Sequence, residues 1–175
     1  MKLRSAICLL ALVATLALST QAQKVEDAVD HDFDFSKAKT YALAPLSKTD
    51  PLNKYPEIEF TVRTELTDQL PKVGLKEDKQ HPDLLVSYTA DQKDYHNSYS
   101  TAQTGVTSGN QSWTEDYMVR TVTLTFFDTT TNKSVWQATS TERTNGGTME
   151  KYVPKLVKKL MDAYRQDAQK KKGKS

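Results

Sequence analysis

Apolar residues recur at helical spacing in two stretches of the chain. The first stretch is 57–70, where apolar side chains return every four residues and Pro71 follows directly. The second stretch is 149–168, and its apolar face is wider. Residues three or four apart share one helix face, so this spacing predicts two amphipathic helices. The apolar positions are Ile58, Val62, Leu66 and Leu70 in the first helix, and Tyr152, Val153, Leu156, Val157, Leu160, Met161 and Tyr164 in the second.

Apolar and polar residues alternate between the two predicted helices, as in strands with one buried face. Threonine fills alternate positions of the middle strand, which indicates a solvated sheet face. In the last strand we expect Trp136 and Ala138 to point inward, and Val135 and Gln137 to point to the opposite face. The expected strands are 24–29 and 39–43 before the first helix, and 84–90, 116–127 and 134–143 after it.

These elements follow one another in the order β-β-α-β-β-β-α. A short polar turn at 128–133 joins the last two strands, which favours an antiparallel hairpin. An antiparallel β-sheet with two helices packed on one face accounts for the order, so we expect an α+β fold. The length suits one domain, 23–169, followed by a basic C-terminal tail at 170–175.

The segment from Gln92 to Ser112 differs in composition from the rest, since it is rich in Ser, Thr, Asn, Gln and Gly. Three aromatic residues lie in or beside it, namely Tyr95, Tyr99 and Trp113. Aromatic and small polar residues together form adaptable contact surfaces, so these three are the candidate binding residues, for a glycan or a partner protein. The alternative is a flexible hairpin loop whose aromatic side chains fold back onto the core.

The first 22 residues predict a secretory signal peptide. Lys2 and Arg4 precede an apolar run of about a dozen residues, and small residues occupy the positions before a cleavage point after Ala22. The run is too short for a bilayer, which needs about 20 apolar residues, and no later stretch is long enough either. An uncleaved N-terminal anchor is the alternative. We therefore expect a periplasmic or secreted protein without a transmembrane segment.

The single cysteine, Cys8, lies inside this apolar run. In a lipoprotein signal the acylated cysteine follows the run, so the position of Cys8 argues against anchoring in the outer membrane. The mature chain then contains no thiol or disulfide, and its core alone must stabilise it.

The net charge of the chain argues against one class of partner. The formal charge of +2 becomes zero when Lys2 and Arg4 are removed with the signal, so the folded part has no basic surplus. We therefore expect no nucleic-acid partner, because such binding relies on basic surfaces.

Metal chemistry finds little support in the sequence. The acidic run 30–34 resembles the start of a calcium loop, but Phe35 and Tyr41 stand where that loop needs glycine and a bidentate glutamate. The three histidines, none of them at the spacing of zinc ligands, are His31, His81 and His96. We expect no metal and no other cofactor.

Catalytic motifs are also incomplete. The segment 105–109 has the glycines of a nucleophile elbow, but its serine is misplaced. Gly146 and Gly147 precede the second helix and offer N–H groups to an anion, but Thr148 as an N-cap explains the segment equally well. Neighbouring carboxylates do not show the facing pair that a glycosidase needs. These pairs are Glu57/Glu59, Glu77/Asp78 and Glu115/Asp116.

Several short motifs, in order and spacing, resemble a bacterial envelope family known as domain of unknown function 4136. They cover nearly all of the mature chain and are Asp32-Phe33-Asp34-Phe35-Ser36, Lys39-Thr40-Tyr41-Ala42, Lys72-Val73-Gly74-Leu75, Pro82-Asp83-Leu84-Leu85-Val86-Ser87-Tyr88, Phe127-Asp128 and Ser134-Val135-Trp136-Gln137. The resemblance implies an α+β envelope domain without an established activity, and hence no catalytic residues. Many members look like lipoproteins, from which this chain departs at Cys8.

A well-patterned core beside incomplete catalytic motifs favours a non-enzymatic envelope domain that binds or scaffolds an envelope or cell-wall partner. Two alternatives remain open: a module that binds a small ligand or cell-wall glycan between sheet and helices, and a hydrolase whose site has no recognisable motif.

Overall fold

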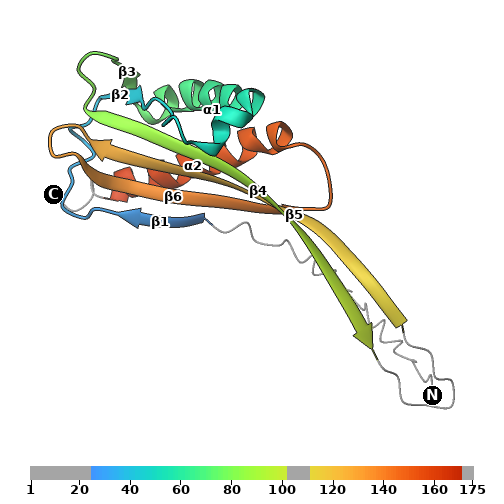
Figure 1. Cartoon of the computed structure of the whole chain (residues 1–175). Coiled ribbons are helices and arrows are strands. Elements are labelled where there is room, and N and C mark those ends of the chain that lie inside the picture. The colour runs from blue at the N-terminus through green and yellow to red at the C-terminus, as the bar shows by residue number, and fades with distance from the viewer. Residues whose placement is uncertain (1–24, 102–110, 171–175) are drawn as a thin grey trace, which may run out of the picture.

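The computed structural model describes residues 25–101 and 111–170. The predicted signal peptide and tail residues 171–175 lie outside the described residues. Six strands form one sheet in the order β1-β6-β5-β4-β2-β3 (Figure 1). The strands are β1 (Val25–Val29), β2 (Thr40–Leu43), β3 (Lys76–Glu77), β4 (Leu84–Thr101), β5 (Gln111–Asp128) and β6 (Lys133–Thr144). The α-helices are α1 (Pro56–Gln69) and α2 (Met149–Lys170), and the 3-10 turns are η1 (Pro51–Lys54) and η2 (Pro71–Val73).

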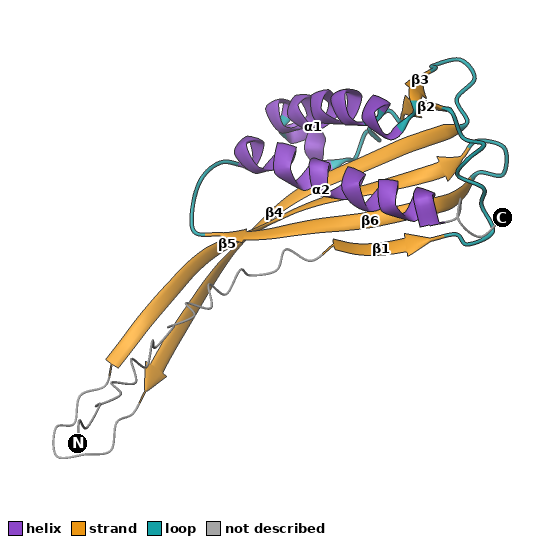
Figure 2. Ribbon diagram, turned by 180° about the vertical axis from the view of Figure 1, so that it is seen from behind, coloured by secondary structure: helices purple, strands orange, loops and turns teal. Residues whose placement is uncertain are grey.

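Both α-helices pack on the same face of the sheet, which confirms the predicted α+β arrangement (Figure 2). The helical stripes meet the alternating strand positions in one core, where Leu66, Leu124 and Leu156 are fully buried. The opposite sheet face is rich in threonine, and no helix of the described residues covers it. Across it, the hydroxyls of Thr123 and Thr139 lie 2.9 Å apart on neighbouring strands. The predicted solvated face is therefore present.

Four aromatic rings form the centre of the core at the end away from the arm. Trp136 packs edge-on against Phe126 at 5.2 Å and against Tyr164 at 5.3 Å between ring centroids. Tyr164 in turn stacks on Phe126 and meets Phe35 edge-on. The indole N–H of Trp136 donates to the carboxylate of Asp167 on α2 at 3.1 Å. Sheet and helix are thus joined by ring packing and one buried polar contact.

The sheet is mixed, which corrects the expectation of a purely antiparallel one. β2 runs parallel to both β3 and β4, while the β1–β6, β4–β5 and β5–β6 pairs are antiparallel. The reason is the connection between β2 and β4. Helix α1 lies between these strands in sequence, and such a crossover returns the chain to the same end of the sheet.

Asp83 joins the beginnings of the two parallel strands. Its carboxylate accepts the backbone N–H groups of Lys39 and Thr40 at 2.8 and 2.9 Å. Its own N–H donates to the hydroxyl of Thr40 at 2.8 Å. The hydrogen bond from Lys39 is the main cause that lowers the pKa of Asp83 below its usual 3.8.

We expect Asp83→Ala to lower the free energy of unfolding at pH 7 by about 1 kcal/mol, since two bonds to an exposed carboxylate are lost. A lowered pKa in the folded state stabilises the protein above the unfolded value, and this contribution disappears as pH falls through the folded pKa. Urea unfolding should therefore show a smaller difference between wild type and Asp83→Ala below pH 3.8 than at pH 7. Asp68→Ala, at an exposed position on α1, is the matched control; an equal loss there would contradict the role of Asp83.

A two-stranded arm projects from the end of the sheet (Figures 1 and 2). β4 and β5 each contain 18 residues and pair without a register shift from Leu84–Asp128 to Thr101–Gln111. The predicted polar loop from Gln92 to Ser112 is therefore wrong over most of its length, because only 102–110 lies outside the strands, among the residues that are not described. None of the buried core residues lies on the described part of the arm, so its strands can be polar at nearly every position and lack the alternation that marks a half-buried strand.

Candidate functional site: the arm and the cleft at its root

The arm begins where β6 ends. Thr144, the last residue of β6, is the register partner of Met118 on β5. Beyond this pair, β4 and β5 have only each other as partners within the described residues. A two-stranded ribbon alone is marginally stable in water, so an arm of this kind is stabilised by contacts on its faces or edges.

One face of the arm carries a stack of three side chains from three adjacent strands. The rings of Tyr95 and Tyr117 lie parallel, with centroids 5.0 Å apart and an interplanar angle of 6°. The guanidinium of Arg143 on β6 lies 3.6 Å from the centre of the Tyr117 ring, in cation–π contact, and pairs with Glu115. This Arg143–Tyr117–Tyr95 stack continues the uncovered sheet face onto the arm.

The three sequence-predicted binding residues occupy one face of this arm by position. Tyr95 and Tyr99 lie on alternate-residue positions of β4 and are 39% and 41% exposed, so their rings are not folded into the core. Trp113 is the register partner of Tyr99, although its side chain lies outside the described part of the structure. Their role in binding stays a prediction. Tyr117 and Arg143 were missed, because neither belongs to the polar segment that drew attention.

The other face of the arm leads into a cleft of about 460 Å³ between the N-terminal ends of both helices and β4. Apolar side chains from four elements line it, and so do acidic residues. The apolar residues include Leu52, Ile58, Met118 and Met149, and the acidic ones are Glu57, Asp94 and Glu150. Asp91 also borders the cleft, but its position on β4 directs its carboxylate to the uncovered sheet face, where it pairs with Lys93. No Lys or Arg is among the described residues that line the cleft.

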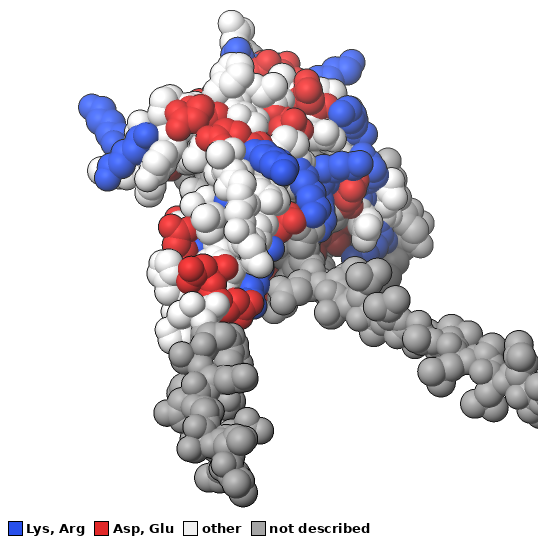
Figure 3. Space-filling model, turned by 90° about the vertical axis from the view of Figure 1, so that its right-hand side faces the viewer, with Lys and Arg blue, Asp and Glu red and all other residues white. Residues whose placement is uncertain are grey.

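Several of these carboxylates lie near the root of the arm. Figure 3, which views the molecule from the arm side, shows Asp and Glu side chains on the arm beside its grey part and again on the body above it. A hydrogen bond from the Thr148 side chain is the main cause that lowers the pKa of Glu150, and the charge of Arg120 acts in the same direction. Glu150 is therefore ionised at neutral pH, and the cleft presents negative charge above an apolar floor.

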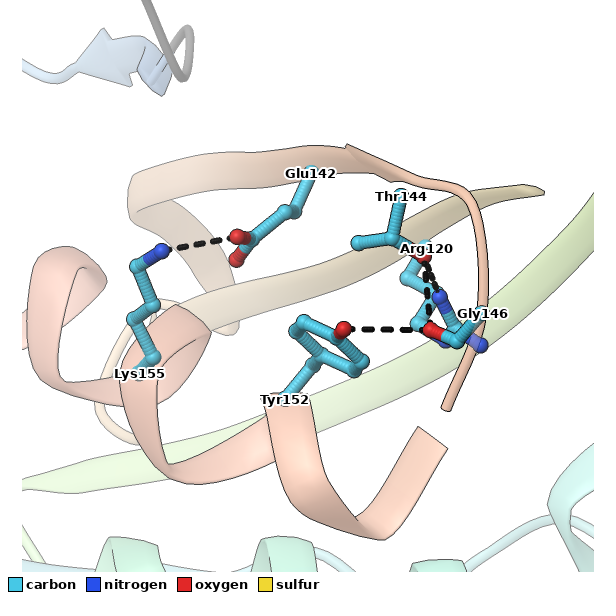
Figure 4. Close-up of polar contacts among 6 residues, drawn as sticks. All are labelled: Arg120, Glu142, Thr144, Gly146, Tyr152 and Lys155. Carbon is cyan, nitrogen blue, oxygen red and sulfur yellow. Dashed lines mark hydrogen bonds and ion pairs between the residues drawn. The ribbon is translucent and has the colours of Figure 1, made fainter. Parts of the chain in front are cut away.

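Arg120 fixes the wall of the cleft beside α2. It is fully buried, and its guanidinium donates to the Thr144 hydroxyl (Figure 4). The guanidinium also donates to the Gly147 carbonyl. The same group lies 4.5 Å from the centre of the Tyr152 ring. The Tyr152 hydroxyl donates to the Gly146 carbonyl at 3.0 Å. The turn before α2 is thereby held against β5.

The sequence contained a signal for Arg120 that went unused. Arg120 continues the core-facing positions of Val122, Leu124 and Phe126, so a charged residue stands in an apolar register. Such an interruption indicates a buried polar contact, since charged residues are almost never fully buried unless paired. Gly147 is the other constrained position. Its φ of +88° and the 2.9 Å from its ideal Cβ to the Tyr152 ring require glycine there.

The remaining sequence candidates do not gather into one site in the described residues. His96 lies on the arm, where its Nδ1 is 2.9 Å from Oδ1 of Asp116, while His31 and His81 belong to separate turns. Among the described residues no group of three or more His, Cys, Asp or Glu side chains is placed to hold a metal. The nucleophile-like segment 105–109 lies outside the described residues.

The fold is a six-stranded sheet with two helices on one face and a projecting arm. A protein family of this class matches most of the chain. The family described as domain of unknown function (DUF4136) matches residues 25–164, and the chain belongs to this family. No curated protein matches the sequence. None of the helices in the described residues is long and apolar enough to cross a membrane.

Solved structures similar to the chain share little sequence with it. A PDZ domain protein from Parabacteroides distasonis superposes with a TM-score of 0.56 at 15% identity, over 77% of this chain and 34% of that one. This chain thus spans about a third of the length of that protein, and the likeness concerns the fold alone. A PelC dodecamer from Paraburkholderia phytofirmans has a TM-score of 0.48 at 15% identity, over 79% of this chain and 94% of that one.

Proposed function

We propose that this protein is a non-enzymatic domain of the cell envelope that binds a partner through its arm. The observation that carries the proposal is the arm itself, a two-stranded ribbon that no other described element covers and on which Tyr95 and Tyr99 are exposed. Exposed aromatic side chains contribute a large share of binding energy at interfaces. The export signal that the sequence predicts over residues 1–22 supports the envelope as the place of action.

Excision of the arm tests this proposal. Residues 96–116 can be replaced by Asn-Gly, because Tyr95 and Tyr117 are register partners whose main-chain groups face each other, and a two-residue turn can join such a pair. After cross-linking in envelope extracts, the full chain should retain a specific protein that the excised variant loses. The double variant Tyr95→Ser/Tyr99→Ser keeps the arm and should weaken the same capture. Identical proteins with and without the arm would overturn the proposal.

The cleft favours a second candidate, binding of a small ligand. Its volume of about 460 Å³ falls in the range of ligand pockets, and apolar walls with a few polar groups are typical of them. The sequence had suggested a ligand between sheet and helices, and the cleft lies at the arm end of that layer. Cell-wall fragments that bind there should raise the unfolding temperature. No shift across a broad panel of fragments would remove this candidate.

A further inference from the structure

Beyond β2, one edge of β4 has no strand partner in the described residues. β2 pairs with β4 only from Leu84 to Val86, whereas β4 continues to Thr101. The last contact on this side is the hydrogen bond from the Ala44 N–H to the Val86 carbonyl at 2.8 Å. The edge therefore starts within the body and continues onto the arm.

The backbone groups that face this edge follow from the register. Alternate residues of a strand direct their N–H and C=O groups to the same side. The carbonyl of Val86 points toward β2, and β4 pairs with β5 without a shift. The main-chain N–H and C=O groups therefore point to the same side at four further residues of β4, namely Tyr88, Ala90, Gln92 and Asp94. Such a row of donors and acceptors is a template for strand addition.

The acidic cleft lies directly along this edge. Ala90, Gln92 and Asp94 belong both to the free edge and to the cleft lining, and η1 and the start of α1 form the opposite wall. A strand added at about 4.8 Å from β4 would place every second side chain on the cleft side of the sheet. There it would meet Asp94, Glu57 and Glu150 above the apolar floor.

We infer that the free edge of β4 at the arm root accepts an extended segment of another polypeptide that carries basic residues at alternate positions. This inference rests on the proposed function and specifies the partner's chemistry. Main-chain hydrogen bonds to Tyr88–Asp94 supply the affinity, and the carboxylates select lysine or arginine by charge complementarity.

Synthetic peptides test the inference on the mature protein. An eight-residue peptide of alternating Thr and Lys should bind in fluorescence anisotropy, more weakly at high salt, whereas the Thr/Glu peptide should not. Two N-methylated versions of the Thr/Lys peptide are compared, one methylated at every Thr and one at every Lys. Because alternate residues direct their N–H groups to the same edge, each version blocks one edge of the peptide. One of these two peptides should lose binding and the other keep it, because only one edge faces β4. If both methylated peptides lost binding, or if both kept it, strand addition would be overturned.

Gln92→Pro supplies the protein variant, since proline removes an N–H that faces the free edge and leaves the β5 ladder intact. We expect affinity for the Thr/Lys peptide to fall roughly tenfold, the effect of one lost hydrogen bond. Gln137→Thr changes the same residue type on the uncovered sheet face and should bind as wild type. Thermal unfolding verifies that both variants fold. Equal affinity for Gln92→Pro and wild type would overturn the inference.

Two results separate this inference from the proposed function. The arm-excised protein retains the edge up to Asp94 and should still bind the Thr/Lys peptide. Capture that depends on the arm, together with no peptide binding by the full chain, would reject only the inference. A dimer in sedimentation that Gln92→Pro abolishes would show that a second copy fills the edge, which would overturn the basic segment as occupant.

Discussion

Trp136→Ala is expected to lower the free energy of unfolding by about 3–5 kcal/mol, the range for removal of a large buried aromatic side chain. The indole contacts the rings of Phe126 and Tyr164 and is fully buried. Its removal also deprives the Asp167 carboxylate of a hydrogen-bond donor. Domains of this size are stable by roughly 5–15 kcal/mol, so the variant should be close to unfolding.

Urea unfolding followed by circular dichroism measures this loss. Phe60→Ala removes an exposed aromatic side chain from α1, so it serves as control and should unfold like wild type. Trp136→Phe retains an aromatic ring, so its free energy of unfolding should lie between those of Trp136→Ala and the control. A loss below about 1 kcal/mol for Trp136→Ala would mean that the aromatic centre contributes far less than its burial indicates.

Arg120→Leu is expected to have the second largest effect, about 2–4 kcal/mol. The substitution leaves the Gly147 carbonyl and the Thr144 hydroxyl without their donor and removes the contact with the Tyr152 ring. Both groups are partly buried, so each lost hydrogen bond costs about 1–2 kcal/mol, and leucine gains part of this back by apolar burial. Because Arg120 holds the turn before α2, the variant should also loosen the cleft wall.

Hydrogen exchange and urea unfolding measure the two parts of this prediction. Amide protons of the second turn of α2, which donate within the helix, should exchange faster in Arg120→Leu than in wild type. Arg143→Leu is the matched control, since Arg143 is partly exposed and stacks on the arm, where the loss should stay below about 1 kcal/mol. Similar losses of stability in Arg120→Leu and Arg143→Leu would show that the burial of Arg120 adds nothing to the free energy of unfolding.

Periodicity predicted the elements whose side chains face a core. Both helices, the β5–β6 hairpin and the inward positions of Trp136 and Ala138 are confirmed. Val135 was expected to point to the opposite face, yet it is buried. A register shift between Phe126 and Phe127 places an extra residue in β6 at this point, and alternation cannot foresee such a bulge.

The candidate site was less accessible to sequence reasoning. Tyr95 and Tyr99 were identified by composition, but the arm that carries them was not, because polar strands without a core have no alternating pattern. The cleft depends on Glu57, Asp94 and Glu150, which come from three separate elements. The proximity of Glu57 to Asp94 follows from the parallel β2–α1–β4 crossover, and this was the part of the topology that the sequence analysis had wrong.

The position of β1 has a consequence for the order of assembly. Val25 pairs with Ser140, so these partners lie 115 positions apart in the sequence. A polypeptide that leaves a ribosome or an export channel with its N-terminus first therefore presents β1 long before β6 exists. The contiguous β4–β5–β6 meander can form early from neighbouring segments, since local pairing closes shorter loops. Closure of the sheet by its first strand is then the final step of maturation, and until that moment the outer edge of β6 stays open to other chains.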